Sequence, residues 1–153
     1  METHYGTGER IGNVENTGGM IATMTVRVTV KGLDALTAKL GSAEAAASHV
    51  RPVMERSLAR IRKPLKVYPP QRPTSYIRTN RLGGAWTSRI EKGGFRGVVG
   101  NNMGRGFKYA PYVQSAEKQA WMHKGHWQTD EDVIESVKDR IVKDFEDHVF
   151  RGL

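Results

Sequence analysis

One pattern restricts the fold of this chain more than any other: apolar side chains recur at three- and four-residue steps after Ser42. Such spacing is typical of an amphipathic helix, which must bury one face against another element. Ser42 is a suitable N-cap, and Pro52 either kinks the helix or begins a new first turn. We therefore expect a long helix laid on a sheet, with its basic side outward. The apolar stripe is Val50, Val53, Met54, Leu58, Ile61 and Leu65, and the polar side carries Arg51, Arg56, Arg60, Arg62 and Lys63.

Three segments can supply the sheet. Residues 24–31 alternate valine with polar side chains, which predicts a half-buried strand that Gly32 ends. Residues 85–91 and 95–100 flank Lys-Gly-Gly at 92–94, a spacing typical of a β-hairpin. Between the first strand and the long helix, Leu33, Leu36 and Leu40 predict a short helix.

The segments between these elements contain many turn residues. Residues 68–73 hold three prolines and are expected to form an extended loop. Residues 79–84 predict a turn around Gly83-Gly84, and residues 100–106 a flexible loop. Residues 107–113 could then form another short strand, interrupted by Pro111.

A second helix is expected near the C-terminus. Thr129 precedes Asp130, Glu131 and Asp132, a capping signature with acids at the positive end of the helix dipole. One apolar stripe follows, formed by Val133, Ile134, Val137, Ile141, Phe145 and Val149. The predicted fold class is therefore α+β, with a small antiparallel sheet packed by a long basic helix and a C-terminal helix. Residues 21–153 are expected to form a single domain.

Residues 1–20 differ from the rest of the chain. They are polar, contain five glycines and show no hydrophobic period, so that alone they should not fold. We expect an extended arm that an adjacent subunit holds. Alternatively, translation starts at Met20 or Met24 and the preceding residues do not belong to the native protein.

Composition limits the core and excludes some chemistry. The hydrophobic share is 38%, so a core can form but neighbouring subunits would help to cover the surface. The absence of cysteine excludes disulfides, thiolate zinc sites and cysteine nucleophiles. No stretch approaches the roughly 18 apolar residues of a membrane span, and no secretory signal is recognised. We expect a soluble protein made in a cytoplasm, without a membrane partner.

The positive charge is concentrated in the middle of the chain. Residues 51–108 carry fourteen Lys/Arg against Glu55 and Glu91, a balance of +12, whereas the whole chain has a net charge of +8. A concentrated basic region indicates nucleic acid or an acidic protein surface as neighbour. It is equally consistent with a solvated face that keeps the protein soluble.

Candidate catalytic and metal-binding patterns are weak. His123 and His126 could ligate zinc with Glu117 or Asp130, but Gly125 between them and the charge of Lys124 argue against it. The Gly-x-Ser-x-Gly motif of serine hydrolases and the Gly-x-x-x-x-Gly-Lys phosphate loop do not occur. We therefore predict no enzyme, no metal site and no cofactor.

Nucleic-acid binding remains an alternative. Basic residues interleave with aromatic ones through the middle of the chain, and such residues grip phosphates and stack on bases. No sequence-specific binding motif is present, so only loose electrostatic contact with DNA is expected. The candidates for that contact on the long helix are Arg56, Arg60, Arg62 and Lys63.

The order of these elements and three short segments resemble a known family. The segments are residues 76–82 (Tyr-Ile-Arg-Thr-Asn-Arg-Leu), 109–114 (Tyr-Ala-Pro-Tyr-Val-Gln) and 123–127 (His-Lys-Gly-His-Trp), which follow Gly-Leu-Asp-Ala-Leu at 32–36 and the long helix. Together they resemble the tail-completion or head–tail joining (neck) proteins of tailed bacteriophages, over roughly residues 25–150. Two residues depart from the pattern: Asn80 stands where the family usually has Gly, and Gln114 replaces a commoner Glu. Asn tolerates the left-handed conformation, so the turn can survive.

The resemblance implies a structural virion protein without catalytic activity. It implies a homo-oligomeric ring, of six copies in this family, between the head connector or stopper and the tail tube or tail terminator, around the passage for genomic DNA. The protein would reside in the virion neck and, during assembly, in the host cytoplasm. A minor capsid or morphogenesis protein of similar fold is an alternative that the sequence does not separate from it.

Interface residues are expected in the proline-rich loop and in the resembling segments. Simple core packing is the alternative for the aromatic residues at 109, 112 and 127, and solvent exposure for the arginines at 78 and 81. The predicted interface residues are Tyr68, Pro69, Pro70, Arg72, Tyr76, Arg78, Arg81, Tyr109, Tyr112, His123, His126 and Trp127.

Overall fold

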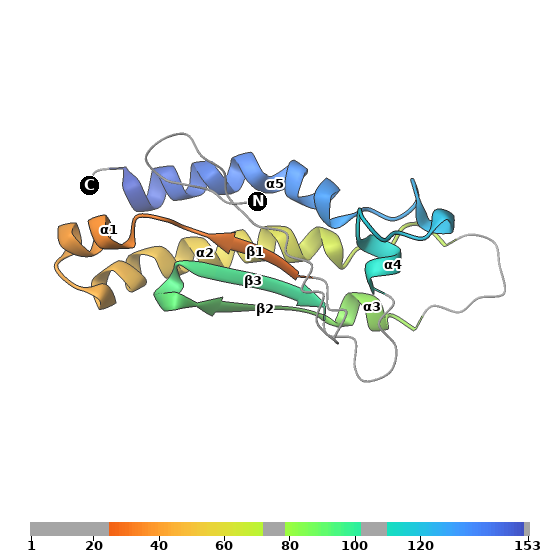
Figure 1. The fold of residues 1–153 in the computed structure, drawn as a ribbon, viewed down its shortest axis with the longest axis horizontal. Coiled ribbons are helices and arrows are strands. Elements are labelled where there is room, and N and C mark those ends of the chain that lie inside the picture. The colour runs from red at the N-terminus through yellow and green to blue at the C-terminus, as the bar shows by residue number, and fades with distance from the viewer. Residues whose placement is uncertain (1–24, 72–78, 102–109, 152–153) are drawn as a thin grey trace.

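A computed structural model describes residues 25–71, 79–101 and 110–151 of the chain. These residues form a three-stranded antiparallel sheet and five α-helices, which confirms the predicted α+β class (Figure 1). The strands are β1 (Thr25–Thr29), β2 (Trp86–Glu91) and β3 (Arg96–Asn101), in the spatial order β1-β3-β2.

The hairpin β2–β3 forms where the glycine pair predicted it. The connection Lys92–Gly94 is a short 3₁₀ turn, η1, in which all three residues have positive φ. Glycine adopts this conformation without steric cost, which is why the turn carries two of them. The register pairs Ile90 with Gly97 and Ser88 with Val99.

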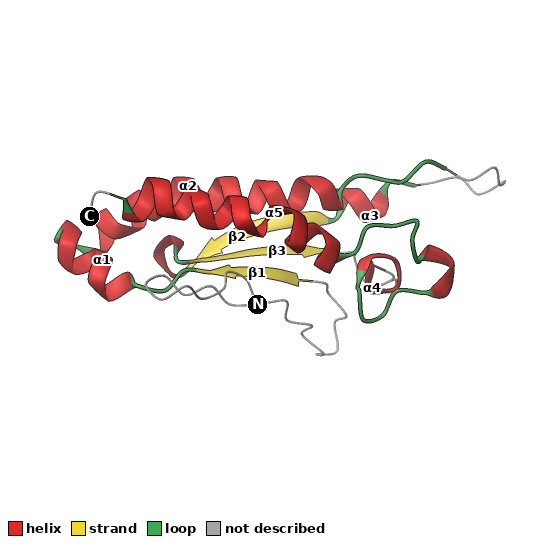
Figure 2. Cartoon of the chain, turned by 90° about the horizontal axis from the view of Figure 1, so that it is seen from above, coloured by secondary structure: helices red, strands yellow, loops and turns green. Residues whose placement is uncertain are grey.

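Two helices form the second layer and cover one face of the sheet (Figure 2). The long helix α2 (Ala43–Leu65) begins at Ser42, whose side-chain oxygen accepts a hydrogen bond from the Ala45 N–H at 3.1 Å. Helix α5 (Asp130–Phe145) lies beside α2 and continues into a π-helical turn, Glu146–Phe150. Pro52 lies inside α2, which continues through it without interruption.

The apolar stripes predicted for both helices form the core. All six stripe residues of α2 are buried, and so are Val26, Val28 and Val30 of the first strand and its extension. At Gly97 the strand comes so close to α2 that a Cβ atom would lie 2.6 Å from both Leu58 Cδ2 and Met54 Sδ. The sheet can approach the helix here only because β3 carries no side chain at this position.

The predicted cap of α5 is confirmed in detail. The Thr129 hydroxyl accepts a hydrogen bond from the Asp132 N–H at 3.1 Å, and the Asp132 carboxylate accepts one from the Thr129 N–H at 3.0 Å. This reciprocal capping box satisfies two backbone donors that the helix itself leaves unpaired.

The small elements lie at the two ends of the layers (Figure 1). Helix α1 (Leu33–Leu40) lies at one end, and α3 (Arg81–Gly84) and α4 (Ala110–Gln114) lie at the other, close to a 3₁₀ turn, η2 (Trp121–His123). Within the described part of the chain, no helix is long and apolar enough to cross a membrane.

Three local predictions need correction. The turn predicted at 79–84 contains a single helical turn, α3, which follows Asn80 in the left-handed conformation (φ 58°). The strand predicted at 107–113 is wrong in its described part, because residues 110–114 are helical and Pro111 is compatible with a first helical turn. Asn101, predicted as loop, belongs to β3, as does Gly100, at which the predicted strand and loop overlapped, and the rest of that loop (102–106) lies outside the described residues.

Candidate functional site

The end of the molecule that carries α3, α4 and η2 exposes unusual apolar surface. Trp121 is 81% exposed, Val67 64%, Tyr112 57% and Met122 48%. Among the described residues, the remaining large apolar side chain in this exposed class is Leu33, on α1 at the opposite end. We call the first four, together with Tyr68 and Trp127, the aromatic end. Large apolar side chains that gather in one exposed region are typical of protein-interaction sites.

Tyr68 fixes the chain that leaves α2. Its ring packs edge-on against Trp127, with ring centroids 5.1 Å apart and an interplanar angle of 72°. Its hydroxyl accepts a hydrogen bond from the Gly83 N–H at 2.9 Å, and a Cβ atom on Gly83 would meet the tyrosine ring at 2.9 Å. The loop after α2, helix α3 and the segment before α5 are therefore held together through one side chain.

A buried glutamine lies beneath the exposed residues. The Gln114 side chain accepts a hydrogen bond from Trp86 Nε1 at 3.2 Å and donates one to the Leu65 carbonyl oxygen at 3.0 Å. It thereby joins α4 to the start of β2 and to the last turn of α2. A glutamate, which the resemblance expects at this position, could accept from the indole but could not donate to the carbonyl unless protonated.

The segment that carries Trp121 is held by its backbone. Gln119 Nε2 donates to the carbonyl oxygens of Val113 and Trp127 at 2.8 and 3.1 Å. The Ala120 N–H donates to the Tyr112 carbonyl oxygen at 2.7 Å. Trp121 thus projects from a turn whose backbone is fixed on both sides, rather than from an unsupported loop.

Asp130, the first residue of α5, links that helix to the segment after α4. The buried Asp130 carboxylate accepts hydrogen bonds from the N–H groups of Ala116 and Glu131, both at 3.0 Å. Burial, with a smaller contribution from the nearby Glu117 carboxylate, nevertheless raises the pKa of Asp130 above its ordinary value of 3.8. The segment after α4 is therefore tied directly to the N-terminus of α5.

The predicted interface residues are only partly brought together here. Tyr68, Tyr112 and Trp127 belong to the aromatic end, with His123 in T-shaped contact with Trp127 at 6.4 Å between ring centroids. Tyr112 is exposed, so the core-packing alternative is wrong for it, whereas Trp127 is partly buried against the core. Pro70 and Arg81 are exposed in the same part of the fold, and Pro69 and His126 are half-buried there. Four predicted residues lie outside the described ones: Arg72, Tyr76, Arg78 and Tyr109.

Three members of the aromatic end were not predicted: Val67, Trp121 and Met122. A signal for them exists, because each is a large apolar residue that belongs to no periodic stripe. Such residues have no helix or strand face to bury them, and the structure leaves all three exposed.

The histidines do not form part of a metal site in the described part of the chain. No group of three or more His, Cys, Asp or Glu side chains there could hold an ion. Gly125, between the two histidines, has a positive φ of 73°, so the segment turns instead of continuing as a helix that would align both rings.

The basic residues of α2 do not form one uniform outward surface. Arg60 faces α5, where its guanidinium makes an ion pair with Asp144 at 2.9 Å. Arg62 turns toward the sheet and donates to the Ser88 hydroxyl at 3.3 Å. Arg56 and Lys63 are exposed. The prediction of a basic side directed outward therefore holds for some of these residues and is wrong for Arg60.

The comparisons with known proteins add nothing to this geometry. Neither the models of known protein families, nor curated proteins, nor solved structures gave a match to the chain.

Proposed function

We propose that this protein is a structural subunit that works by docking to other proteins through its aromatic end. The observation that carries the proposal is the combination of exposure and support: Trp121 and Tyr112 are exposed, while hydrogen bonds from Gln119 and Ala120 hold the backbone that carries them. Aromatic residues held in place lose little conformational entropy on binding, which suits them as interface anchors.

More specifically, we propose a ring-forming subunit of the junction between the head and the tail of a tailed bacteriophage. Residues 109–114 and 123–127, on which the resemblance rests, contribute Tyr112 and Trp127 to the aromatic end. In this proposal copies of the chain form a ring, of six in the resembling family, between the head connector or stopper and the tail tube or tail terminator. The protein catalyses no reaction, and its place is the virion neck after assembly in the host cytoplasm.

Light scattering coupled to size-exclusion chromatography tests self-association. We expect the purified protein to elute as a species several times the chain mass of 17.1 kDa. If the aromatic end lies between copies, the double variant Tyr112→Ser/Trp121→Ser lowers that mass. Leu33→Ser, an exposed apolar residue on α1, is the matched control and should leave it unchanged.

The aromatic end could instead contact an adjacent layer of the neck. In that case both variants still form the ring, but the double variant fails to enter phage particles while the control enters them. Immunoelectron microscopy of particles locates the protein at the neck or elsewhere. A chain that is monomeric at every concentration and absent from particles would overturn the proposal, and a location in the capsid would favour the minor capsid alternative.

A second candidate, nonspecific binding to DNA, is favoured by the exposed Arg56 and Lys63 within a region of balance +12. Such binding should weaken steeply as salt rises, because Lys and Arg displace condensed counterions. A filter-binding titration with duplex DNA measures this directly. Arg56→Glu/Lys63→Glu should abolish binding, and no affinity at low salt would remove this candidate.

A further inference from the structure

Strand β2 is an edge strand of the sheet that the described residues form. Within the described part of the chain it pairs with β3 alone, because the strand order is β1-β3-β2. In Figure 1 this edge lies on the flank opposite α5. An edge strand offers rows of backbone donors and acceptors that another extended chain can pair with. Residues 86–91 contain no proline, which would have blocked such pairing.

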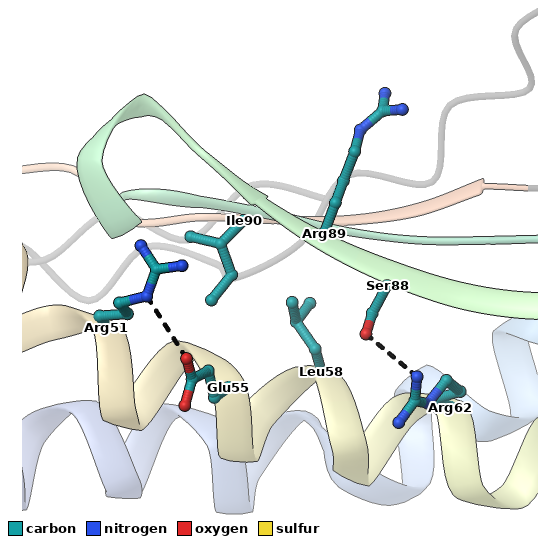
Figure 3. Close-up of a pocket in the computed structure, with 7 residues that line it drawn as sticks. All are labelled: Arg51, Glu55, Leu58, Arg62, Ser88, Arg89 and Ile90. Carbon is teal, nitrogen blue, oxygen red and sulfur yellow. Dashed lines mark hydrogen bonds and ion pairs between the residues drawn. The ribbon is translucent and has the colours of Figure 1, made fainter.

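A groove runs along this edge between β2 and α2, with a volume of about 380 Å³. Leu58 of the helix and Ile90 of the strand supply the apolar part of its lining (Figure 3). Ser88 and Ile90 point from the strand toward the helix, whereas Arg89 points to the other side of the sheet, as alternation along a strand requires. The helix contributes Arg51, Glu55 and Arg62 to the wall.

The charges around the groove favour an acidic occupant. Arg51 and Arg62 face the groove against Glu55, a balance of +1. Arg89, on the other side of the sheet, forms an ion pair with Glu91 at 2.6 Å. Arg51 and Glu55 form an exposed ion pair at 3.4 Å, which contributes little and can be exchanged for a better partner. Arg62 donates one hydrogen bond to Ser88 and keeps further guanidinium N–H groups for a carboxylate.

These features also disfavour a nucleic acid as the occupant. A nucleic-acid backbone supplies acceptors but no row of N–H donors for the strand carbonyls, and it gains nothing from Leu58 and Ile90.

We propose that this groove binds an extended acidic segment of a partner protein as a fourth strand along residues 88–91. Alternate side chains of that segment would face α2, where apolar ones cover Leu58 and Ile90 and carboxylates reach Arg51 and Arg62. The intervening carboxylates would face Arg89. Main-chain pairing supplies affinity and the alternate side chains supply specificity. The proposal does not depend on ring formation or on the aromatic end.

Fluorescence anisotropy with the full chain tests it. The probe is a fluorescein-labelled octapeptide, Glu-Glu-Val-Glu-Glu-Glu-Val-Glu, which presents both valine and glutamate on one face of an extended strand and glutamate alone on the other. We expect saturable binding that weakens as salt rises, and a loss of affinity of roughly tenfold or more for Arg62→Glu/Arg89→Glu. Arg56→Glu/Lys63→Glu makes the same change in net charge at exposed positions of α2 outside the groove and should retain the affinity of the wild type. Far-UV circular dichroism establishes that each variant is folded.

Further arms identify the mode of binding and the occupant. The same peptide methylated at alternate backbone nitrogens cannot complete a ladder and should not bind, and a valine–lysine peptide should not bind either. Trp121→Ser should bind the acidic peptide like the wild type, so that failure here and failure of the proposed function are distinguished. Equal binding of the methylated peptide, or no binding of the acidic one, overturns the proposal. The proposal is also overturned if Arg62→Glu/Arg89→Glu loses duplex DNA binding or self-association but keeps its affinity for the peptide.

Discussion

At the scale of single residues, the amide of Gln114 joins parts of the chain that are far apart in sequence. It is 1% exposed and bridges Trp86 and Leu65. Gln114→Leu would keep the volume but leave an indole N–H and a carbonyl oxygen buried without partners. We expect a loss of about 2–4 kcal/mol in the free energy of unfolding, because each such group costs about 1–3 kcal/mol.

Urea denaturation followed by circular dichroism measures this loss. Gln128→Leu, the same change at an exposed position, is the matched control and should alter stability by no more than about 0.5 kcal/mol. Equal effects of the two changes would show that the Gln114 hydrogen bonds contribute nothing specific.

Asp130 makes the stability of the fold depend on pH. Because burial raises the pKa of its carboxyl in the folded state, the folded protein binds this proton more tightly than the unfolded chain does. The stability that the protonated form contributes is complete below pH 3.8 and is lost as the pH rises through the raised folded pKa. Asp130→Asn cannot titrate, so its free energy of unfolding should rise relative to that of the wild type over this interval. Urea denaturation of both proteins at a series of pH values measures the difference, and curves that stay parallel would contradict the prediction.

At the scale of elements, the contact between the sheet and α2 depends on Gly97. A methyl group there would collide with Leu58 and Met54, both of which are buried in the core. Gly97→Ala should therefore cost about 1–3 kcal/mol through overpacking. Gly84→Ala is the control, because a Cβ atom there meets nothing within 4 Å and the backbone is helical. Chemical denaturation compares the two, and a neutral Gly97→Ala would mean that the helix and sheet separate easily.

At the scale of the whole molecule, α2 is the element to which the other layers attach. It packs against the sheet, α1 and α5, and its ion pair from Arg60 to Asp144 joins the two long helices. The 3₁₀ turn at Trp121–His123 contributes no buried side chain. Local opening requires the least free energy where few buried contacts are lost.

Hydrogen–deuterium exchange monitored by mass spectrometry should reveal this difference. We expect amides in the middle of α2, around Val53 and Leu58, to exchange at rates set by global unfolding. Those of η2 should exchange earlier through local opening. Comparable protection of both segments in the free protein would contradict the predicted hierarchy. Selective protection of η2 on ring formation would support the aromatic end as an interface.

The sequence alone determined the elements whose signals are local and periodic. The stripe from Val50 to Leu65, the valine alternation, the glycine hairpin and the capping box at Thr129 each predicted the element that the structure contains. Local prediction failed at residues 110–114, because Pro111 is compatible with both an irregular strand and a first helical turn.

Tertiary structure decided which residues meet and which remain exposed. No local pattern specifies that Gln114 reaches Trp86 and Leu65, that Arg60 turns to α5, or that β2 lies against the arginines of α2. The physical reason is that periodicity defines a buried face but not its partner. The partner depends on how the layers stack, and that arrangement left Trp121 exposed although the sequence marks it only as apolar.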